Sequence, residues 1–284
     1  AQAALKEENL LLVMKNLIKA HEIEPDEIEI LIAMLEIQEK LEHWTQMLPN
    51  IDLLINLQPD QIKWPICRLV TLQFCEAFDT VVEESLLLLK LYPRHTKILT
   101  LLARAYYELN NFSLALNTVN ILIEFNLGTA EPFVIRGLIY KSIGDRDRAK
   151  IDLLKAESFG EKTLLVFNAL GAFYADVHEH ETALAYYSKA LSLAENSSMS
   201  AKIALNASQS AMSLGKFDIG WQLYAYRKTD KATKFGTVMK ETVYPVWQGE
   251  NLIGKHLVIR REQGLGDELR FSSVIAEIAT EAKL

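Results

Sequence analysis

The residues best suited to chemistry lie near the carboxy-terminal end of the chain, in the run 262–267 (Glu-Gln-Gly-Leu-Gly-Asp). The apolar centre of the preceding stretch, 255–260, predicts a buried strand, and apolar residues at helical spacing predict a helix over 268–282. Between a strand and a helix, Gly264 and Gly266 would let backbone N–H groups approach an anion, to which the helix adds its positive end. The pattern therefore predicts a phosphate- or carboxylate-binding loop.

Asp267 follows this loop and has two interpretations. An aspartate at the start of a helix is an ordinary N-cap, which contributes about 1 kcal/mol. The same carboxylate could also act on a ligand held by the loop, and one residue could do both. A dinucleotide site is not predicted, because Leu269 stands where the fingerprint needs a third glycine.

The histidines and cysteines predict no metal centre. His178 and His180 fall in an expected turn, with no third ligand near them in the sequence. Cys67 and Cys75 are the only cysteines, and they lie eight residues apart on an expected helix. We interpret them as buried thiols rather than as a disulfide or a metal-binding pair, which favours a cytoplasmic protein.

Composition argues against two further classes of partner. The 284 residues carry a net charge of −7 and no basic block, which argues against a nucleic-acid-binding surface. The longest apolar runs, such as 85–91, are far shorter than the roughly 20 residues of a membrane span. Because the sequence starts with neither Met nor a signal peptide, we expect a fragment or a processed product.

The elements that must position any site are repeats of one unit, in which equivalent residues recur at every thirty-fourth position. Ala103, Gly137 and Gly171 show this spacing, and each unit has a polar or glycine-containing turn near its middle. The same spacing relates Tyr106, Tyr140 and Tyr174, as well as Ala115, Ala149 and Ala183. A small residue lets the two helices of a hairpin approach to about 8–10 Å. Since one hairpin cannot bury its own apolar face, neighbouring hairpins must stack, and we predict an all-α fold.

These residues resemble the tetratricopeptide (TPR) family, which implies a right-handed α-solenoid. On this basis we expect four repeats, at 96–129, 130–163, 164–200 and 201–234, with a three-residue slip in the frame before the last. Residues 25–95 are interpreted as degenerate hairpins of the same solenoid, because Leu35 and Leu69 replace the small residue. We expect a capping helix over 1–24, and a linker and the start of an α/β domain over 235–284.

A second resemblance lies in the carboxy-terminal string. Trp247-x-Gly249, Leu252-x-Gly254-Lys255 and Leu265-Gly266-Asp267 resemble the junction of bacterial TPR proteins whose repeats lead into a GT-B glycosyltransferase domain with a heptosyltransferase-like first strand. The resemblance implies a metal-independent parent enzyme with a nucleotide-sugar donor. It makes Asp267 the candidate general base for an acceptor hydroxyl, with Gly264 and Gly266 shaping the loop. Because one strand cannot form the two lobes of such an enzyme, we expect this chain alone to be inactive and without a cofactor.

In a TPR-like superhelix, the first helix of each hairpin lines the concave face. Counting along these helices gives the candidate peptide-binding residues Lys97, Arg104, Tyr107, Lys141, Asn168 and Gln209. The same count places Thr100, Glu131, Val134 and Lys202 on this face. Mixed polar side chains with an aromatic ring suit an extended peptide held by side-chain hydrogen bonds. The alternative is a solvated face without a ligand.

Two functions remain open from the sequence. In one, the repeats recruit a protein or glycan acceptor for a glycosyltransferase. In the other, the chain is an adaptor that binds a partner protein, and the glycine loop is a structural turn. A natural protein that continues for about 250 residues with alternating strands and helices would favour the first. Homo-oligomers are compatible with both.

Overall fold

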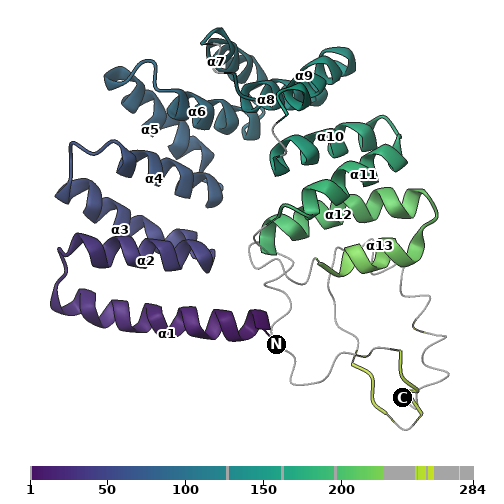
Figure 1. Cartoon of the computed structure of the whole chain (residues 1–284), viewed down its shortest axis with the longest axis horizontal. Coiled ribbons are helices and arrows are strands. Elements are labelled where there is room, and N and C mark those ends of the chain that lie inside the picture. Colours follow the sequence, from purple (N-terminus) through teal and green to yellow (C-terminus); the bar gives the residue numbers. More distant parts are fainter. Residues whose placement is uncertain are drawn as a thin grey trace. The chain divides into compact units, whose positions relative to one another are not determined.

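A computed structural model describes residues 2–125, 128–160, 163–194, 197–226, 247, 249–253, 255–258 and 275. The described residues up to 226 form α-helices joined by short turns, which confirms the predicted all-α fold (Figure 1). The helices are α1 (Gln2–Ile23), α2 (Ile28–Lys40), α3 (Trp44–Leu57), α4 (Lys63–Phe74), α5 (Phe78–Leu91), α6 (Thr96–Glu108), α7 (Phe112–Glu124), α8 (Glu131–Ser142), α9 (Arg146–Ser158), α10 (Leu164–Asp176), α11 (His180–Leu191), α12 (Ser197–Ser213) and α13 (Phe217–Tyr224).

The chain divides into two compact units, 1–173 and 174–284, and each is described by itself. In the first unit each helix from α1 to α8 packs against the next, and the first helices of successive hairpins also touch, α4 against α6 and α6 against α8. In the second unit α11 packs on α12 and α12 on α13. The apolar faces are therefore buried between neighbours, as stacked hairpins require.

The turns between the paired helices share one backbone conformation. Positive φ recurs at the repeat spacing, at Glu42, Glu76, Asn110, Gly144 and His178, and Gly215 follows three positions late. In each turn the next N–H donates to the carbonyl five residues earlier, as in His43 to Gln38 (2.8 Å) and Ala77 to Leu72 (3.0 Å). This left-handed cap, with its six-to-one hydrogen bond, is a Schellman motif. The hairpins over 28–91 thus keep the repeat's turn, although their sequences are degenerate.

The slip in the frame before the last hairpin has a simple cause. α12 has 17 residues, whereas α6 and α10 have 13 each. The first helix is therefore about one turn longer, and every later position moves along by the same amount.

The small residue of the repeat lies where the two helices of a hairpin approach closely. A Cβ added to Gly137 on α8 would meet Leu153 Cγ of α9 at 2.8 Å and the Ala149 carbonyl oxygen at 3.3 Å. In the preceding hairpin the equivalent pair is Ala103 and Val119, which belong to one buried cluster. A larger residue on the first helix is thus matched by a smaller one on the second.

This exchange of volume also explains Leu69, where the small-residue rule fails. In the hairpin of Leu69, the position equivalent to Leu153 carries Ser85, which is fully buried. Within the described part of the chain the Ser85 hydroxyl has no hydrogen-bond partner, so the position uses its small size rather than its polarity. The first hairpin departs from the rule, because Leu35 and Ile51 are both large and share a core cluster.

The strand predicted over 255–260 is not found in its described part. Residues 255–258 form neither helix nor strand, and the Lys255 N–H closes a turn on the Leu252 carbonyl at 2.9 Å. Val258 is exposed, and no described strand lies beside it. The segment therefore has no described partner with which it could form a sheet. Gly264, Gly266, Asp267 and the predicted helix, apart from Ile275, lie outside the described residues.

The shared turn gives a first prediction. Replacing Glu76 by Gly should raise the free energy of unfolding by about 0.5–1 kcal/mol, because glycine removes the cost of a left-handed residue with a Cβ. Gly144→Ala is the converse control: its added Cβ meets nothing within 4 Å, so a loss of about 1 kcal/mol would report on its φ of +84° alone. Urea unfolding followed by circular dichroism measures both, and a destabilised Glu76→Gly would contradict this account of the turn.

The crossing gives a second prediction. Gly137→Ala should destabilise the chain by about 1–2 kcal/mol, because overpacking against Leu153 outweighs the better helix propensity of alanine. Adding Leu153→Val copies the Ala103–Val119 pair and should restore most of the loss. Thermal unfolding of the single and double variants measures the rescue, and equal instability of both would refute the exchange of volume.

Candidate protein-binding surface

The first helices of the hairpins in the first unit form a polar surface. We call it the first-helix surface and define it by Gln73 of α4, by Lys97, Arg104 and Tyr107 of α6, and by Glu131 and Lys141 of α8. Hydrogen bonds join these helices side by side. Gln73 Nε2 of α4 donates to the Leu101 carbonyl of α6 at 2.7 Å. Arg104 Nη2 of α6 donates to Glu131 Oε1 of α8 at 2.8 Å. These bonds hold the side chains in fixed positions before any ligand binds.

Four of the predicted peptide-binding residues lie on this surface. Lys97 is exposed in the first turn of α6, and Lys141 is half-buried in the last turn of α8. Arg104 and Tyr107 are half-buried, and each bonds to α8: Arg104 to Glu131, and the Tyr107 hydroxyl to Ser142 Oγ at 3.3 Å. The two lysines therefore offer the charges of this surface, while Arg104 and Tyr107 join neighbouring hairpins.

Two residues that the sequence count placed on this face are buried. Thr100 is 6% exposed and donates its hydroxyl to the Thr96 carbonyl, and Val134 is fully buried. The count was wrong here because neighbouring first helices pack on one another, α4 and α8 on α6 and α6 on α8. Each helix therefore has a narrower exposed stripe than it would have in isolation. Glu131 is half-buried, and Lys202 is exposed in α12.

Asn168 and Gln209 differ in their surroundings. Asn168 is half-buried on α10, and its Oδ1 is buried without a hydrogen-bond partner among the described residues. A buried amide oxygen without a donor costs about 1–3 kcal/mol. Gln209 is exposed on α12 in the second unit, and is considered only there.

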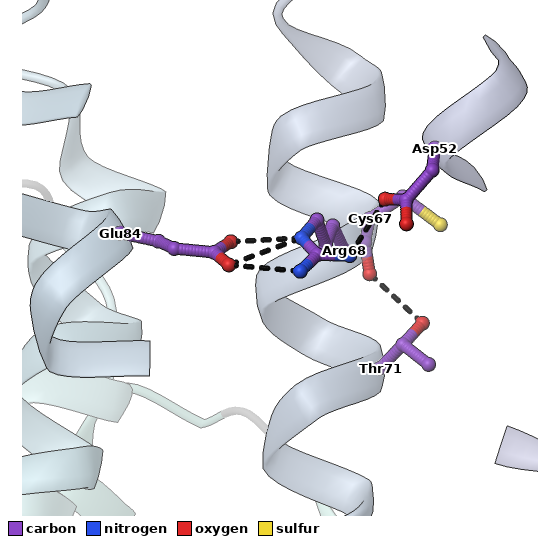
Figure 2. Close-up of polar contacts among 5 residues, drawn as sticks. All are labelled: Asp52, Cys67, Arg68, Thr71 and Glu84. Atoms are coloured by element: carbon purple, nitrogen blue, oxygen red, sulfur yellow. Dashed lines mark hydrogen bonds and ion pairs between the residues drawn. The ribbon is translucent and has the colours of Figure 1, made fainter. Parts of the chain in front are cut away.

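Sequence reasoning missed two arginine clusters, each of which ties three helices together. Arg68 of α4 donates through Nη1 to Asp52 Oδ1 of α3 at 2.6 Å, and through Nε to Glu84 Oε2 of α5 at 3.0 Å (Figure 2). Figure 2 shows the guanidinium lying between the two carboxylates. The hydrogen bond to Glu84 raises the pKa of Arg68 above its usual value, so the residue stays charged.

Arg136 of α8 repeats the arrangement two hairpins later. It donates through Nε to Asp152 Oδ2 of α9 at 2.7 Å and through Nη2 to Asp152 Oδ1 at 2.8 Å. Its Nη1 donates to Asn120 Oδ1 of α7 at 2.9 Å. Asp152 is only 3% exposed, and its hydrogen bond is the main cause of the raised pKa of Arg136. In both clusters each partner is separated from its arginine by the same sequence distance, and the two arginines are themselves two repeat units apart. This regular spacing could have been found in the sequence.

The cysteines and histidines show no further chemistry in the described part of the chain. Cys67 and Cys75 are free, and burial raises the pKa of both thiols, which lowers their reactivity at neutral pH. The His178 and His180 rings are 5.9 Å apart, but no three potential metal ligands gather among the described residues. None of the helices described is both long and apolar enough to cross a bilayer.

Comparison with known proteins identifies the repeat. Residues 130–159, which contain α8 and α9, match the family model of the tetratricopeptide repeat. Residues 130–159 are a TPR repeat. Over 177 residues it is 25% identical to Protein FlbA of Caulobacter vibrioides, a match that spans 62% of this chain and 29% of that protein. The chain therefore corresponds to less than a third of the length of this relative.

Several solved structures are similar to this chain in fold. The Cut9–Hcn1 crystal structure of the APC/C matches with a TM-score of 0.62 and 13% identity, over 83% of this chain and 46% of that one. A tetratricopeptide repeat protein from Parabacteroides merdae matches with a TM-score of 0.54 and 16% identity, over 80% of this chain and 93% of that one. The type IV pilus biogenesis factor PilW matches with a TM-score of 0.53 and 14% identity, over 72% of this chain and 93% of that one. At these identities the likeness concerns the fold alone.

The ion pair of Arg136 with the buried Asp152 gives a third prediction. Arg136→Met should destabilise the chain by about 3 kcal/mol, because Asp152 would be left buried and unpaired. Arg136→Met with Asp152→Leu should recover most of that loss. Urea unfolding measures both, and hydrogen exchange in α8 and α9 locates the change. A single variant as stable as the unmodified chain would contradict a role for Arg136 in joining the helices.

Proposed function

We propose that this chain is a TPR scaffold that binds a segment of a partner protein on its first-helix surface. The observation that carries the proposal is the row of bonds from Gln73 to Leu101 and from Arg104 to Glu131, which fixes three neighbouring first helices and their polar side chains. A surface ordered before binding loses less entropy when a ligand arrives.

The side chains indicate how such a segment would be held. Lys97 and Lys141 would pair with carboxylates or carbonyl oxygens of the partner. Extended peptides are commonly recognised through such main-chain hydrogen bonds. The mixed polarity of the surface favours a protein ligand, and the acidic chain disfavours nucleic acid.

A matched pair of variants tests this proposal. Partners captured from the source cells by the natural protein should bind at least about tenfold more weakly to Lys97→Ala/Lys141→Ala, because two charged contacts are lost. Lys150→Ala/Lys155→Ala, on the exposed side of the second helix α9, removes the same charge elsewhere and should leave affinity unchanged. Equal weakening by both pairs, measured by surface plasmon resonance, would overturn the proposal.

The finer proposal is that this scaffold is the cytoplasmic, acceptor-recruiting arm of a bacterial glycosyltransferase. Its support is the resemblance of the strings around Trp247, Leu252 and Asp267 to a GT-B junction, together with the fact that the match to FlbA spans only 29% of that protein. The longer protein would bind a nucleotide-sugar, and Asp267 would take the proton from a glycan or protein acceptor. Homo-oligomers are compatible with this arrangement. The alternative is a pure adaptor without catalysis.

Nucleoside diphosphate binding by the longer natural protein separates these alternatives. Calorimetric titration should show binding if the parent is a transferase, and no binding if it is an adaptor. Asp267→Asn should abolish transfer while leaving the fold intact, because asparagine is as good an N-cap as aspartate but is not a base. Full activity of Asp267→Asn would exclude Asp267 as the base.

A further inference from the structure

A stacked aromatic pair lies at the edge of the first unit where the hairpin turns are. Trp44, the first residue of α3, and Phe74, the last of α4, have ring centroids 4.1 Å apart and planes 9° from parallel. Phe74 is 45% exposed although Trp44 covers one of its ring faces. A large part of an aromatic ring is therefore open to solvent at this edge.

The repeat does not require an aromatic residue at position 74. The positions equivalent to Phe74 in the other units carry Lys40, Glu108, Ser142 and Asp176, all of them polar. By contrast, the positions equivalent to Trp44 in the next two hairpins carry Phe78 and Phe112. Trp44 thus follows the repeat, and Phe74 is the exception.

Several carboxylates lie close to the pair in the sequence. Glu39, Glu76 and Asp79 are exposed within five residues of one ring or the other, and Glu42 is half-buried in the turn before Trp44. Lys40 is the one ammonium near these residues in the sequence. An exposed ring flanked by carboxylates attracts a cation, since the ring face and the acids favour the same sign of charge.

The acidic character extends over the whole of this part of the chain. Residues 24–84 contain thirteen acidic and three basic residues, a net charge of −10, whereas the complete chain carries −7. Two of the three basic groups are already engaged: Arg68 with Asp52 and Glu84, and Lys63 over the Trp64 ring at 4.3 Å. This charge attracts basic partners and repels acidic proteins and nucleic acid.

We propose that this turn edge binds a basic segment of a partner protein, with a lysine or arginine side chain lying on the open part of Phe74 and paired with Glu76 and Asp79. The site is distinct from the first-helix surface, because it is formed by the turns after α2 and α4 and by the first turns of α3 and α5. Trp44 holds the ring in place, so the cation meets a fixed surface.

The test uses the full chain and a fluorescein-labelled peptide in which Lys and Arg alternate with Gly and Ser. Fluorescence anisotropy should show binding that weakens with salt and is absent when Glu replaces the basic residues. Phe74→Ser, which installs the residue found at 142, should bind about fivefold to tenfold more weakly. Phe74→Leu retains an apolar side chain against Trp44 but has no ring, and should lose nearly as much even if Phe74→Ser is destabilised.

Two controls match these changes. Ile143→Ser removes a side chain that is likewise 45% exposed, in the turn after α8, and should leave binding within about twofold. Glu76→Gln/Asp79→Asn should weaken binding about fivefold, whereas Glu83→Gln/Glu124→Gln, with the same change of charge, should not.

Three results would overturn the proposal. The first is no binding by the unmodified chain, and the second is equal weakening by the variants and their controls, which would indicate general charge attraction. The third is self-association in sedimentation experiments that Phe74→Ser abolishes, because a second copy of the chain would then occupy the edge. None of these results depends on the lysines of the first-helix surface, so the two proposals fail separately.

Discussion

The close approach of the two helices in each hairpin is the constraint on which the rest of this structure depends. At Gly137 and Leu153 there is no room for one additional carbon atom. The residues directly before them, the half-buried Arg136 and the buried Asp152, form an ion pair across the same two helices. An apolar contact and a charged contact thus lie side by side at one crossing. The crossing sets the spacing of α8 and α9. Arg136 also donates to Asn120, which joins α7 to the same pair of helices.

The hairpins reach the same geometry with different residues. Arg68, two hairpins before Arg136, also precedes the crossing residue, Leu69, and it bonds to Glu84 directly before Ser85. The hairpin between them has Leu102 and Thr118 at these positions, so the charged contact alternates with an uncharged one. What the hairpins over 62–158 share is the combined volume at the crossing and the left-handed turn that follows, rather than the identity of any one residue.

This explains how far the sequence could predict the structure. Ala103, Gly137 and Gly171 revealed the period because small residues stand on the same helix in three successive units. At Leu69 the repeat period could not be recognised from the small residue, because in that hairpin the small residue is Ser85, on the second helix. The left-handed turns at Glu42 and Glu76 contain no glycine from which the sequence could have predicted them. Thr100 and Val134 were misplaced because exposure depends on neighbouring helices, whereas the position of Lys97 follows from its own helix alone. Asp267 stays a prediction.

The hairpins offer two different surfaces to partners. The first-helix surface carries Lys97 and Lys141 and is joined across helices by the bond from Arg104 to Glu131. The turn edge has the ring of Phe74 among carboxylates, in a region of net charge −10 over residues 24–84. A partner with an extended polar segment suits the first surface, and a basic segment suits the second. Both depend on the same stacked hairpins for their rigidity.

Hydrogen exchange of the chain in complex with its captured partner, read by mass spectrometry, tests the central claim most directly. The account predicts added protection in the peptides that cover 97–108 and 131–142, where the first helices α6 and α8 lie. It predicts no change over 150–158, in the second helix α9. Protection confined to α7 and α9 would contradict the account, because the partner would then bind the second helices rather than the surface that the inter-helix bonds hold in place.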